Sequence, residues 1–330
     1  MKVPFGAREV MGCVTALVEE SPYANLRYLS KVIGKQSLVT PKVLKLARWI
    51  ADYYCCPPEI ALKSVLPEAV RKEKDGWKEQ LFVRALIPAP EVELKLTKRQ
   101  KEIWKLIEEK KELPLQEFLE LAETTAETVR RLEDKGLVSI AAQISERDPY
   151  ARENILPSTA LPLNPQQQHA MAKIKAAMDR GNGGTVKTFL LYGVTGSGKT
   201  EVYLQAIEHA LSLGRDAIIL VPEISLTPQT VERFKARFSS GSLKTLVAVL
   251  HSHLSAGERH DEWHKIRQGR AKIVIGARSA IFAPVEPLGL IIVDEEHEHS
   301  YKQEESPRYN ARDVAVVRGQ MEEAVVVLGS

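Results

Sequence analysis

The run GVTGSGKT at residues 193–200 constrains the possible folds of this chain more than any other feature. Its glycines let successive backbone N–H groups turn toward phosphate oxygens, and the helix that follows directs the positive end of its dipole to the same place. Such a loop needs a strand before it and a helix after it. Residues 188–193 and 199–213 predict that strand and that helix, and Gly214 ends the helix.

The same run predicts an ATP site that uses Mg²⁺. Lys199 can reach the β and γ phosphates, and the Thr200 hydroxyl can hold the metal ion. The residues expected to bind the nucleotide are Gly193, Val194, Thr195, Gly196, Ser197, Gly198, Lys199 and Thr200.

A second motif, DEEH at residues 294–297, supplies carboxylates for the same chemistry. It follows the apolar run LGLIIV, so Asp294 should emerge at the carboxyl edge of a sheet, where ligands of open α/β folds bind. We expect Asp294 to hold Mg²⁺ through water and Glu295 to orient or deprotonate the attacking water. Alone, DEEH would indicate an acidic surface turn. Together with the phosphate loop in one sheet, it makes Lys199, Asp294 and Glu295 the expected catalytic residues.

From residue 164 to residue 330, apolar runs alternate with helical segments. Runs that are apolar throughout, rather than at every second position, are typical of strands buried on both faces. The segment therefore predicts an α/β domain whose parallel sheet is covered by helices on both sides. The expected strands are TFLLYG, AIILVP, LVAVLH, KIVIGA, LGLIIVDEE and AVVVLGS.

Residues 1–90 predict a small α/β module. Strand-like runs lie at 12–18 and 80–87, and apolar residues recur at helical spacing over 41–54. Residues 1–100 hold 17 Lys/Arg against 11 Asp/Glu, while the rest of the chain holds 29 against 32. Both an anionic partner near the N-terminus and an ordinary solvated surface are consistent with this asymmetry.

Residues 91–145 read as three helices with apolar faces, followed by a strand that begins after a glycine. That order is typical of the winged-helix variant of the helix-turn-helix. Arginines and carboxylates are mixed on the third helix, so DNA contact and a packing role both stay open for this domain. Residues 146–163 are polar, contain three prolines and predict a linker.

The cysteine content and the hydropathy of the sequence indicate where in the cell the protein is located. Three cysteines without a CxxC spacing fit a reduced cytosolic setting. No apolar stretch approaches 18 residues, and the N-terminus lacks the apolar core of a signal peptide. We therefore expect a cytoplasmic protein without membrane contact.

These motifs together resemble the PriA family, the primosomal protein N′ helicases of superfamily 2 that act in replication restart. The resemblance covers nearly the whole chain and includes long strings that are little shared with other helicases. It implies that residues 164–330 form the first RecA-like helicase lobe and that residues 1–90 form part of a module that binds a DNA 3′ end. The strings are LLYGVTGSGKTEVYL, VPEISLTPQ, LHSHLSAGERHDEW, IVIGARSAIFAP, LGLIIVDEEHEHSYKQEESPRYNARDVAVVR, VVLGS, VPFG and LARWIADYYCCP.

The resemblance also implies roles for single residues. Gln167 lies where such helicases contact adenine, although Gln166 stands where the family more often has an acidic residue. Bases stack on aromatic and Arg side chains at about 1–3 kcal/mol each, which suits a loop that senses DNA; the alternative for that loop is a packed surface. The DNA contacts implied are Gly6 and Arg27 near the 3′-end pocket, Arg278 and Ser279 along the single strand, and Tyr301, Arg308 and Tyr309 in the sensing loop.

The resemblance implies that family members are longer than these 330 residues. The resemblance implies further residues of the 3′-end pocket before VPFG. Beyond the GSAT motif, at which residues 329–330 stop, it implies a second RecA-like lobe with an arginine finger, a cysteine-rich zinc insertion and a C-terminal domain. The zinc-binding cysteines are absent from this chain. We expect this polypeptide alone to bind ATP weakly and to unwind nothing.

The resemblance implies an ATP-dependent 3′-to-5′ DNA helicase that recognises stalled or branched forks and starts primosome assembly. Its implied partners are branched and single-stranded DNA, other primosome proteins and single-stranded-DNA-binding protein. One alternative is a non-catalytic fragment that binds branched DNA and keeps a nucleotide pocket. Another is a phosphate-loop ATPase or kinase that acts on something other than DNA.

Overall fold

The computed structural model describes residues 1–6, 8–14, 17–32, 37–66, 70, 78–86, 97–145, 155–180, 187–239 and 245–330. Contacts divide the chain into two compact units. One joins Met1–Asp75 to Asp148–Ser330, and the other is Gly76–Arg147. In the part of the chain that the structure describes, no helix is both long enough and apolar enough to cross a membrane.

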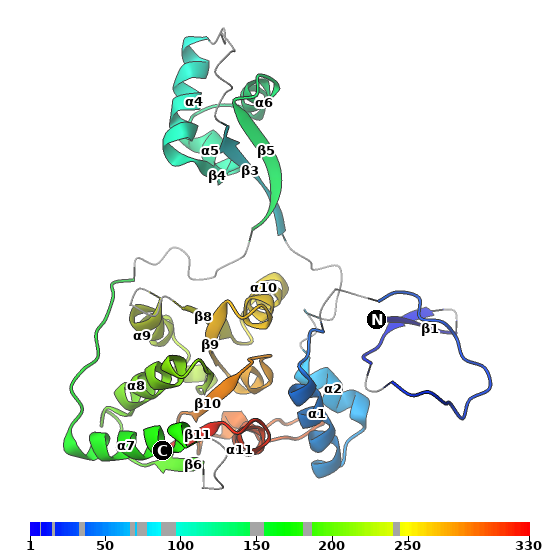
Figure 1. Ribbon diagram of the computed structural model, residues 1–330, viewed down its shortest axis with the longest axis vertical. Coiled ribbons are helices and arrows are strands. Elements are labelled where there is room, and N and C mark those ends of the chain that lie inside the picture. Colours follow the sequence, from blue (N-terminus) through cyan, green and yellow to red (C-terminus); the bar gives the residue numbers. More distant parts are fainter. Residues whose placement is uncertain are drawn as a thin grey trace. The chain divides into compact units, whose positions relative to one another are not determined.

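A six-stranded parallel sheet forms the centre of the first unit (Figure 1). Its spatial order is β6-β11-β10-β7-β9-β8, and β7 and β10 are buried along their whole length, as their continuous apolar sequences require. This confirms the predicted RecA-like parallel sheet. The strands are β6 Thr188–Leu191, β7 Asp216–Leu220, β8 Leu246–Leu250, β9 Ala271–Gly276, β10 Leu288–Val293 and β11 Val325–Gly329.

Helices cover both faces of this sheet because alternate side chains of each strand point to opposite sides. In β7, Ile219 belongs to one core and Ile218 to the other. The first core includes α7 Pro165–Asp179, α8 Lys199–Ser212 and α9 Pro228–Phe238. The second includes α10 Ala256–Arg267, α11 Ala311–Glu322 and the short helices η3 Arg278–Phe282 and η4 His299–Tyr301. A further short helix, η2 Glu223–Ser225, follows β7.

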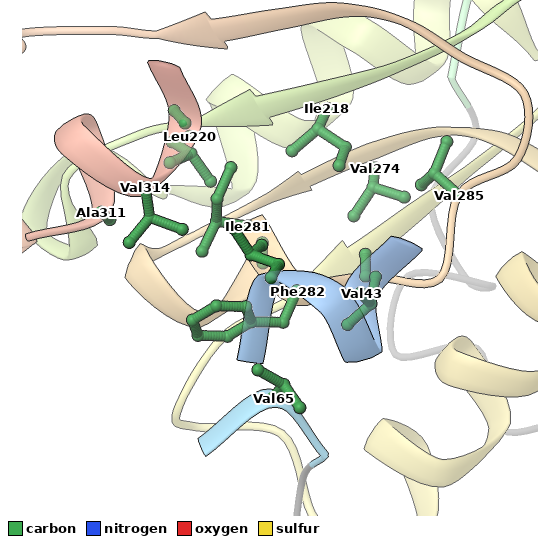
Figure 2. Close-up of a cluster of buried hydrophobic side chains, with 14 of the residues drawn as sticks. Val43, Val65, Ile218, Leu220, Val274, Ile281, Phe282, Val285, Ala311 and Val314 are labelled. Carbon is green, nitrogen blue, oxygen red and sulfur yellow. The ribbon is translucent and has the colours of Figure 1, made fainter. Parts of the chain in front are cut away.

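Two N-terminal helices, α1 Pro41–Tyr53 and α2 Pro58–Val65, share the second core. Figure 2 shows Val43 of α1 and Val65 of α2 beside Phe282. Polar contacts tie the same segment to the sheet domain: Trp263 Nε1 donates to Leu38 O at 3.0 Å, and Asn310 N donates to the Tyr54 hydroxyl at 3.1 Å. The apolar stripe of α1 is thus buried in the core on one face of the parallel sheet.

The extreme N-terminus forms an antiparallel hairpin of β1 Lys2–Phe5 and β2 Arg8–Met11. Gly6 lies in its turn with φ +63°, a conformation that glycine adopts without steric cost. The strand expected at 12–18 is wrong for the described residues of that range, because β2 ends at Met11 and only Gly12 continues its pairing, with Met1. Residues 15 and 16 lie outside the described part.

The second unit combines three helices with a three-stranded antiparallel sheet of order β4-β3-β5. Ile107, Phe118 and Leu132, one from each helix, are fully or almost fully buried in its core. The strand expected at 80–87 belongs here rather than with the N-terminal segment, because β3 pairs along its length with β5. The three helices occur in the predicted order, and the winged-helix assignment stays a prediction. The elements are β3 Lys78–Ala85, α4 Lys98–Lys110, β4 Glu112–Pro114, α5 Leu115–Leu121, α6 Ala126–Asp134 and β5 Val138–Ser145.

Candidate active site

The phosphate-type loop lies between β6 and α8, in the strand-loop-helix context that its sequence predicts. Gly196 and Gly198 have φ angles of +81° and +84°, which residues with a side chain rarely adopt. Space is a second constraint, because a Cβ on Gly198 would lie 2.5 Å from Gln167 Nε2. A Cβ on Gly193 would lie 2.7 Å from Ser197 Oγ. The loop therefore accepts only glycine at these positions without local rearrangement.

Helix α7 places Gln167 against this loop. Gln167 Nε2 donates to Ser197 O at 2.9 Å, and its Oε1 accepts from Asn164 N at 2.9 Å as part of the capping box that starts α7. A cavity of about 440 Å³ opens beside it and is also lined by His169 and Tyr192. The Tyr192 side chain is exposed and directly precedes the loop. The adenine contact of Gln167 stays a prediction, and sequence reasoning missed the neighbouring Tyr192 and His169.

The DEEH motif lies at the end of β10, on the same edge of the sheet. Asp294 N donates to Leu220 O at 2.9 Å, which continues the ladder by one residue. Burial raises the pKa of the Asp294 carboxyl, while a hydrogen bond from Tyr203 and the charge of Lys199 act in the opposite direction. Glu295 follows with φ +46°, a left-handed conformation that is uncommon for a residue with a side chain.

The three predicted catalytic side chains meet in one place. Lys199 Nζ donates to Gly193 O at 2.6 Å and lies 3.7 Å from Glu295 Oε1. Lys199 is 11% exposed and Glu295 31%, so the pair is partly shielded from water. A cavity of about 580 Å³ is lined by the loop, Asp294 and Glu295. The structure thus brings together the cation and both carboxylates that the two motifs predict.

The last strand joins the two motifs. Gly193 N donates to Ser330 O at 2.9 Å, and Glu296 N donates to Gly329 O at 2.7 Å. Strand β11 lies between β6 and β10 in the sheet, so its end borders both the start of the loop and the DEEH turn. The distance between loop and carboxylates is therefore set by main-chain hydrogen bonds.

A segment that the sequence predicts to be a linker lines one side of the cavity beside the phosphate loop. Ser158, Thr159 and Leu161 of this segment, residues 155–163 in the described part of the predicted linker, line the cavity of about 580 Å³. Leu161 N donates to Glu201 Oε1 at 3.1 Å, and Ser158 N donates to Ala236 O at 3.0 Å. Glu201 also accepts from the buried guanidinium of Arg237 at 2.9 Å. Nothing in the polar, proline-containing sequence signals these contacts, since they depend on helices that follow later in the chain.

The residues present fit a magnesium nucleotide. Thr200 and Asp294 line the same cavity, and hydroxyl and carboxylate oxygens are the ligands that Mg²⁺ takes in phosphate-binding proteins. The glycine backbone leaves a cradle that side chains would fill, and Lys199 supplies a positive charge beside it.

The structure brings four of the predicted DNA contacts into one loop region. Arg278 Nη1 donates to Lys302 O at 2.6 Å, which ties it to the segment that carries Arg308. Tyr301 and Tyr309 are buried, with 1% and 3% exposure, and burial raises the pKa of Tyr309 to about 12. Their rings pack inside the domain, which agrees with the alternative of a packed surface loop. Bases could stack on these rings only if the loop opened. Their DNA contacts stay predictions.

The other predicted DNA contacts lie apart from this loop region or at its edge. Ser279 is exposed in η3, next to Arg278. Gly6 lies in the β1–β2 turn, and Arg27 is exposed in a segment without helix or strand. The roles of all three stay predictions.

Comparison with known proteins finds two family models that match parts of the chain. The model of the DEAD/DEAH box helicases matches residues 164–328, and the model of the PriA 3′ DNA-binding domain matches residues 1–67. Replication restart protein PriA of Bacillus subtilis is 36% identical, over 99% of this chain and 48% of that protein. The Chlamydia pneumoniae protein of the same name is 39% identical, over 90% of this chain and 40% of its own length. The chain thus spans less than half the length of these relatives.

Proposed function

Because this chain belongs to the DEAD/DEAH box helicase family and is a homologue of the replication restart protein PriA, we propose that it is the DNA-binding part and first motor lobe of an ATP-dependent DNA helicase. The observation that carries this proposal is the convergence of Lys199, Asp294 and Glu295 on one cavity. The 3′ DNA-binding match over residues 1–67 supports DNA as the substrate.

Each side chain has a separate task in this proposal. The Lys199 ammonium holds the β and γ phosphates, and Glu295 orients or deprotonates the attacking water. Thr200 and Asp294 hold Mg²⁺, which offsets the negative charge of the phosphates when it is bound. Hydrolysis of a γ-phosphate depends mainly on positioning and charge stabilisation, so a rigid arrangement of these groups is the main requirement.

The direction of movement, the DNA structure recognised and the partners are proposed from the resemblance to the PriA family. We propose movement in the 3′-to-5′ direction and recognition of stalled or branched forks. We also propose that primosome assembly takes place in the cytoplasm, with other primosome proteins and single-stranded-DNA-binding protein. The N-terminal 3′ DNA-binding match supports recognition of a fork that carries a 3′ end.

We also propose that the 330-residue polypeptide by itself binds ATP weakly and unwinds no duplex. The resemblance implies that hydrolysis takes place between two RecA-like lobes, with an arginine finger from the second. Such an arginine contributes about 10³- to 10⁵-fold in rate. The described residues form one parallel sheet and thus one side of such a cleft.

The test is ATP turnover with and without a forked DNA that carries a 3′ end. It compares this chain with a chain extended through a second lobe. Lys199→Ala should abolish turnover and leave fork binding nearly unchanged, because Lys199 lies in the loop. Lys175→Ala removes an exposed lysine of α7 and is the matched control.

The outcomes separate the alternatives. Stimulation by DNA only in the longer chain supports the proposal. Fork binding without turnover in either chain favours a non-catalytic branched-DNA-binding fragment, and turnover independent of DNA favours an enzyme that acts on another substrate. Robust unwinding by the 330-residue chain would contradict its proposed inactivity, and loss of both turnover and fork binding in Lys199→Ala would contradict the domain assignment.

A further inference from the structure

Tyr203 contacts the acidic motif directly, although neither motif includes it. It lies near the start of α8, three residues after Thr200, with 2% of its surface exposed. Its hydroxyl donates to Asp294 Oδ1 at 2.9 Å. The helix that begins at the phosphate loop therefore also holds the carboxylate at the end of β10.

A second tyrosine holds the same residue at another atom. The Tyr301 hydroxyl donates to the backbone oxygen of Asp294 at 2.6 Å, and the Tyr301 side chain is 1% exposed. Asp294 is thus anchored at its carboxylate from α8 and at its carbonyl from η4. A phenolic O–H, with an ordinary pKa of about 10, is protonated near neutral pH, so both hydroxyls act as donors to Asp294.

The close packing around Tyr203 shows that its place is tightly defined. A Cβ on Gly329, at the end of β11, would overlap the Tyr203 hydroxyl and lie 3.2 Å from Asp294 Oδ1. Glycine at this position leaves the space in which the hydroxyl reaches the carboxylate. Helix α8, strand β10 and strand β11 therefore all contribute to one contact.

We propose that Tyr203 is a positioning residue that keeps the Asp294 carboxylate turned toward the cavity that Thr200 also lines, ready to hold Mg²⁺ with the nucleotide. Tyr301 supports the same placement through the main chain. This inference rests on the proposed function, because it assigns a supporting residue to the proposed magnesium-nucleotide site. Partners that orient a metal ligand by hydrogen bonding typically change metal affinity about 10- to 100-fold when removed.

The test is Tyr203→Phe, which removes the hydroxyl and keeps the ring. Binding of a fluorescent ATP analogue is measured by anisotropy in EDTA and across a titration with Mg²⁺. In EDTA the variant should bind like the wild type, while the Mg²⁺ concentration for half-maximal enhancement should rise about tenfold. Tyr54→Phe is the matched control, since it removes a hydroxyl that accepts from Asn310 N and does not touch Asp294.

Each result is decisive. An unchanged Mg²⁺ requirement in Tyr203→Phe would overturn the inference, and so would an equal loss of nucleotide binding in EDTA, which would assign Tyr203 to the loop. If thermal melting shows that Tyr203→Phe does not fold, Tyr301→Phe tests the same placement with the same readout. A wild-type chain whose nucleotide binding ignores Mg²⁺ would instead contradict the proposed function.

Discussion

Gly198 meets two separate requirements at the point where the phosphate loop becomes helix α8. Its φ of +84° lies in the left-handed region, and a Cβ would come within 2.5 Å of Gln167 Nε2. A left-handed residue with a side chain costs about 1–2 kcal/mol. The contact with Gln167 adds a local cost, because Gln167 also donates to Ser197 O.

We therefore predict that Gly198→Ala weakens ATP binding as well as stability, because it moves both the loop and Gln167. Gly214→Ala is the control: Gly214 has φ +69°, but a Cβ at this position would have no other atom within 4 Å. Gly214→Ala should lose about 1–2 kcal/mol in the free energy of unfolding, and Gly198→Ala should lose more because of its contact with Gln167; urea unfolding measures both. Only Gly198→Ala should lose affinity for a fluorescent ATP analogue, and equal affinity in the two variants would contradict the role of Gln167.

For single residues, the sequence predicts the members of a motif. It misses residues that lie outside the motif and contact it only in the folded protein. Lys199, Asp294 and Glu295 can be predicted because local spacing defines them. Tyr203 cannot, since it meets Asp294 across 91 positions and only the folded sheet brings the two together. Tyr309 is predicted to face DNA, but its ring packs edge-on against Phe282 with centroids 5.2 Å apart.

Helices α8 and α9 are joined by a buried ion-pair network. Arg237 of α9 contacts Glu201 and Glu208 of α8, each at 2.9 Å, and its side chain is 5% exposed. Glu201 also accepts the backbone N–H of Leu161, so the segment 155–163 is attached to the same network. One guanidinium therefore fixes three elements beside the larger cavity.

Replacing Arg237 with Met should destabilise the first unit by about 3–5 kcal/mol, because it leaves Glu201 and Glu208 facing each other without their cation. Arg233→Met, an exposed change on the same helix, is the control and should stay within about 0.5 kcal/mol of the wild type. Urea unfolding measures both. Adding Glu201→Gln to Arg237→Met should recover part of the loss, and equal stability of the two arginine variants would show that the network contributes nothing.

Among the elements, hydrophobic periodicity predicts the sheet strands and most helices, because burial on both faces leaves a clear apolar pattern. It cannot predict which partner an apolar stripe meets. The stripe of α1 packs beside Phe282 of the sheet domain, and β3 pairs with β5, more than 50 positions later in the sequence. The segment 155–163 carries no periodic signal, because its backbone is held by side chains and carbonyls of other elements.

The whole molecule contains two compact units with separate cores. The core of Gly76–Arg147 includes Phe118 with no exposed surface, while Phe234 of α9 is 2% exposed in a core of the first unit. Units with separate cores can unfold independently. A substitution in one should leave the ligand site of the other intact.

Phe118→Ala should therefore destabilise Gly76–Arg147 by about 3–5 kcal/mol and leave the affinity for a fluorescent ATP analogue unchanged. Phe234→Ala should cost a similar amount in the first unit and weaken nucleotide binding on heating. Hydrogen exchange, resolved by peptide, shows which unit loses protection. Loss of protection in both units after Phe118→Ala would mean that they unfold as one.

The end of β11 limits how this domain can change in evolution. Because it accepts hydrogen bonds from both Gly193 and Glu296, an insertion or deletion within Val325–Gly329 would shift the phosphate loop and the acidic turn relative to each other. A change of one residue would also turn every side chain beyond it to the opposite face of the sheet. Surface loops elsewhere can gain or lose residues at little cost. Homologous sequences should therefore differ in the lengths of their surface loops but keep the same number of residues in β11.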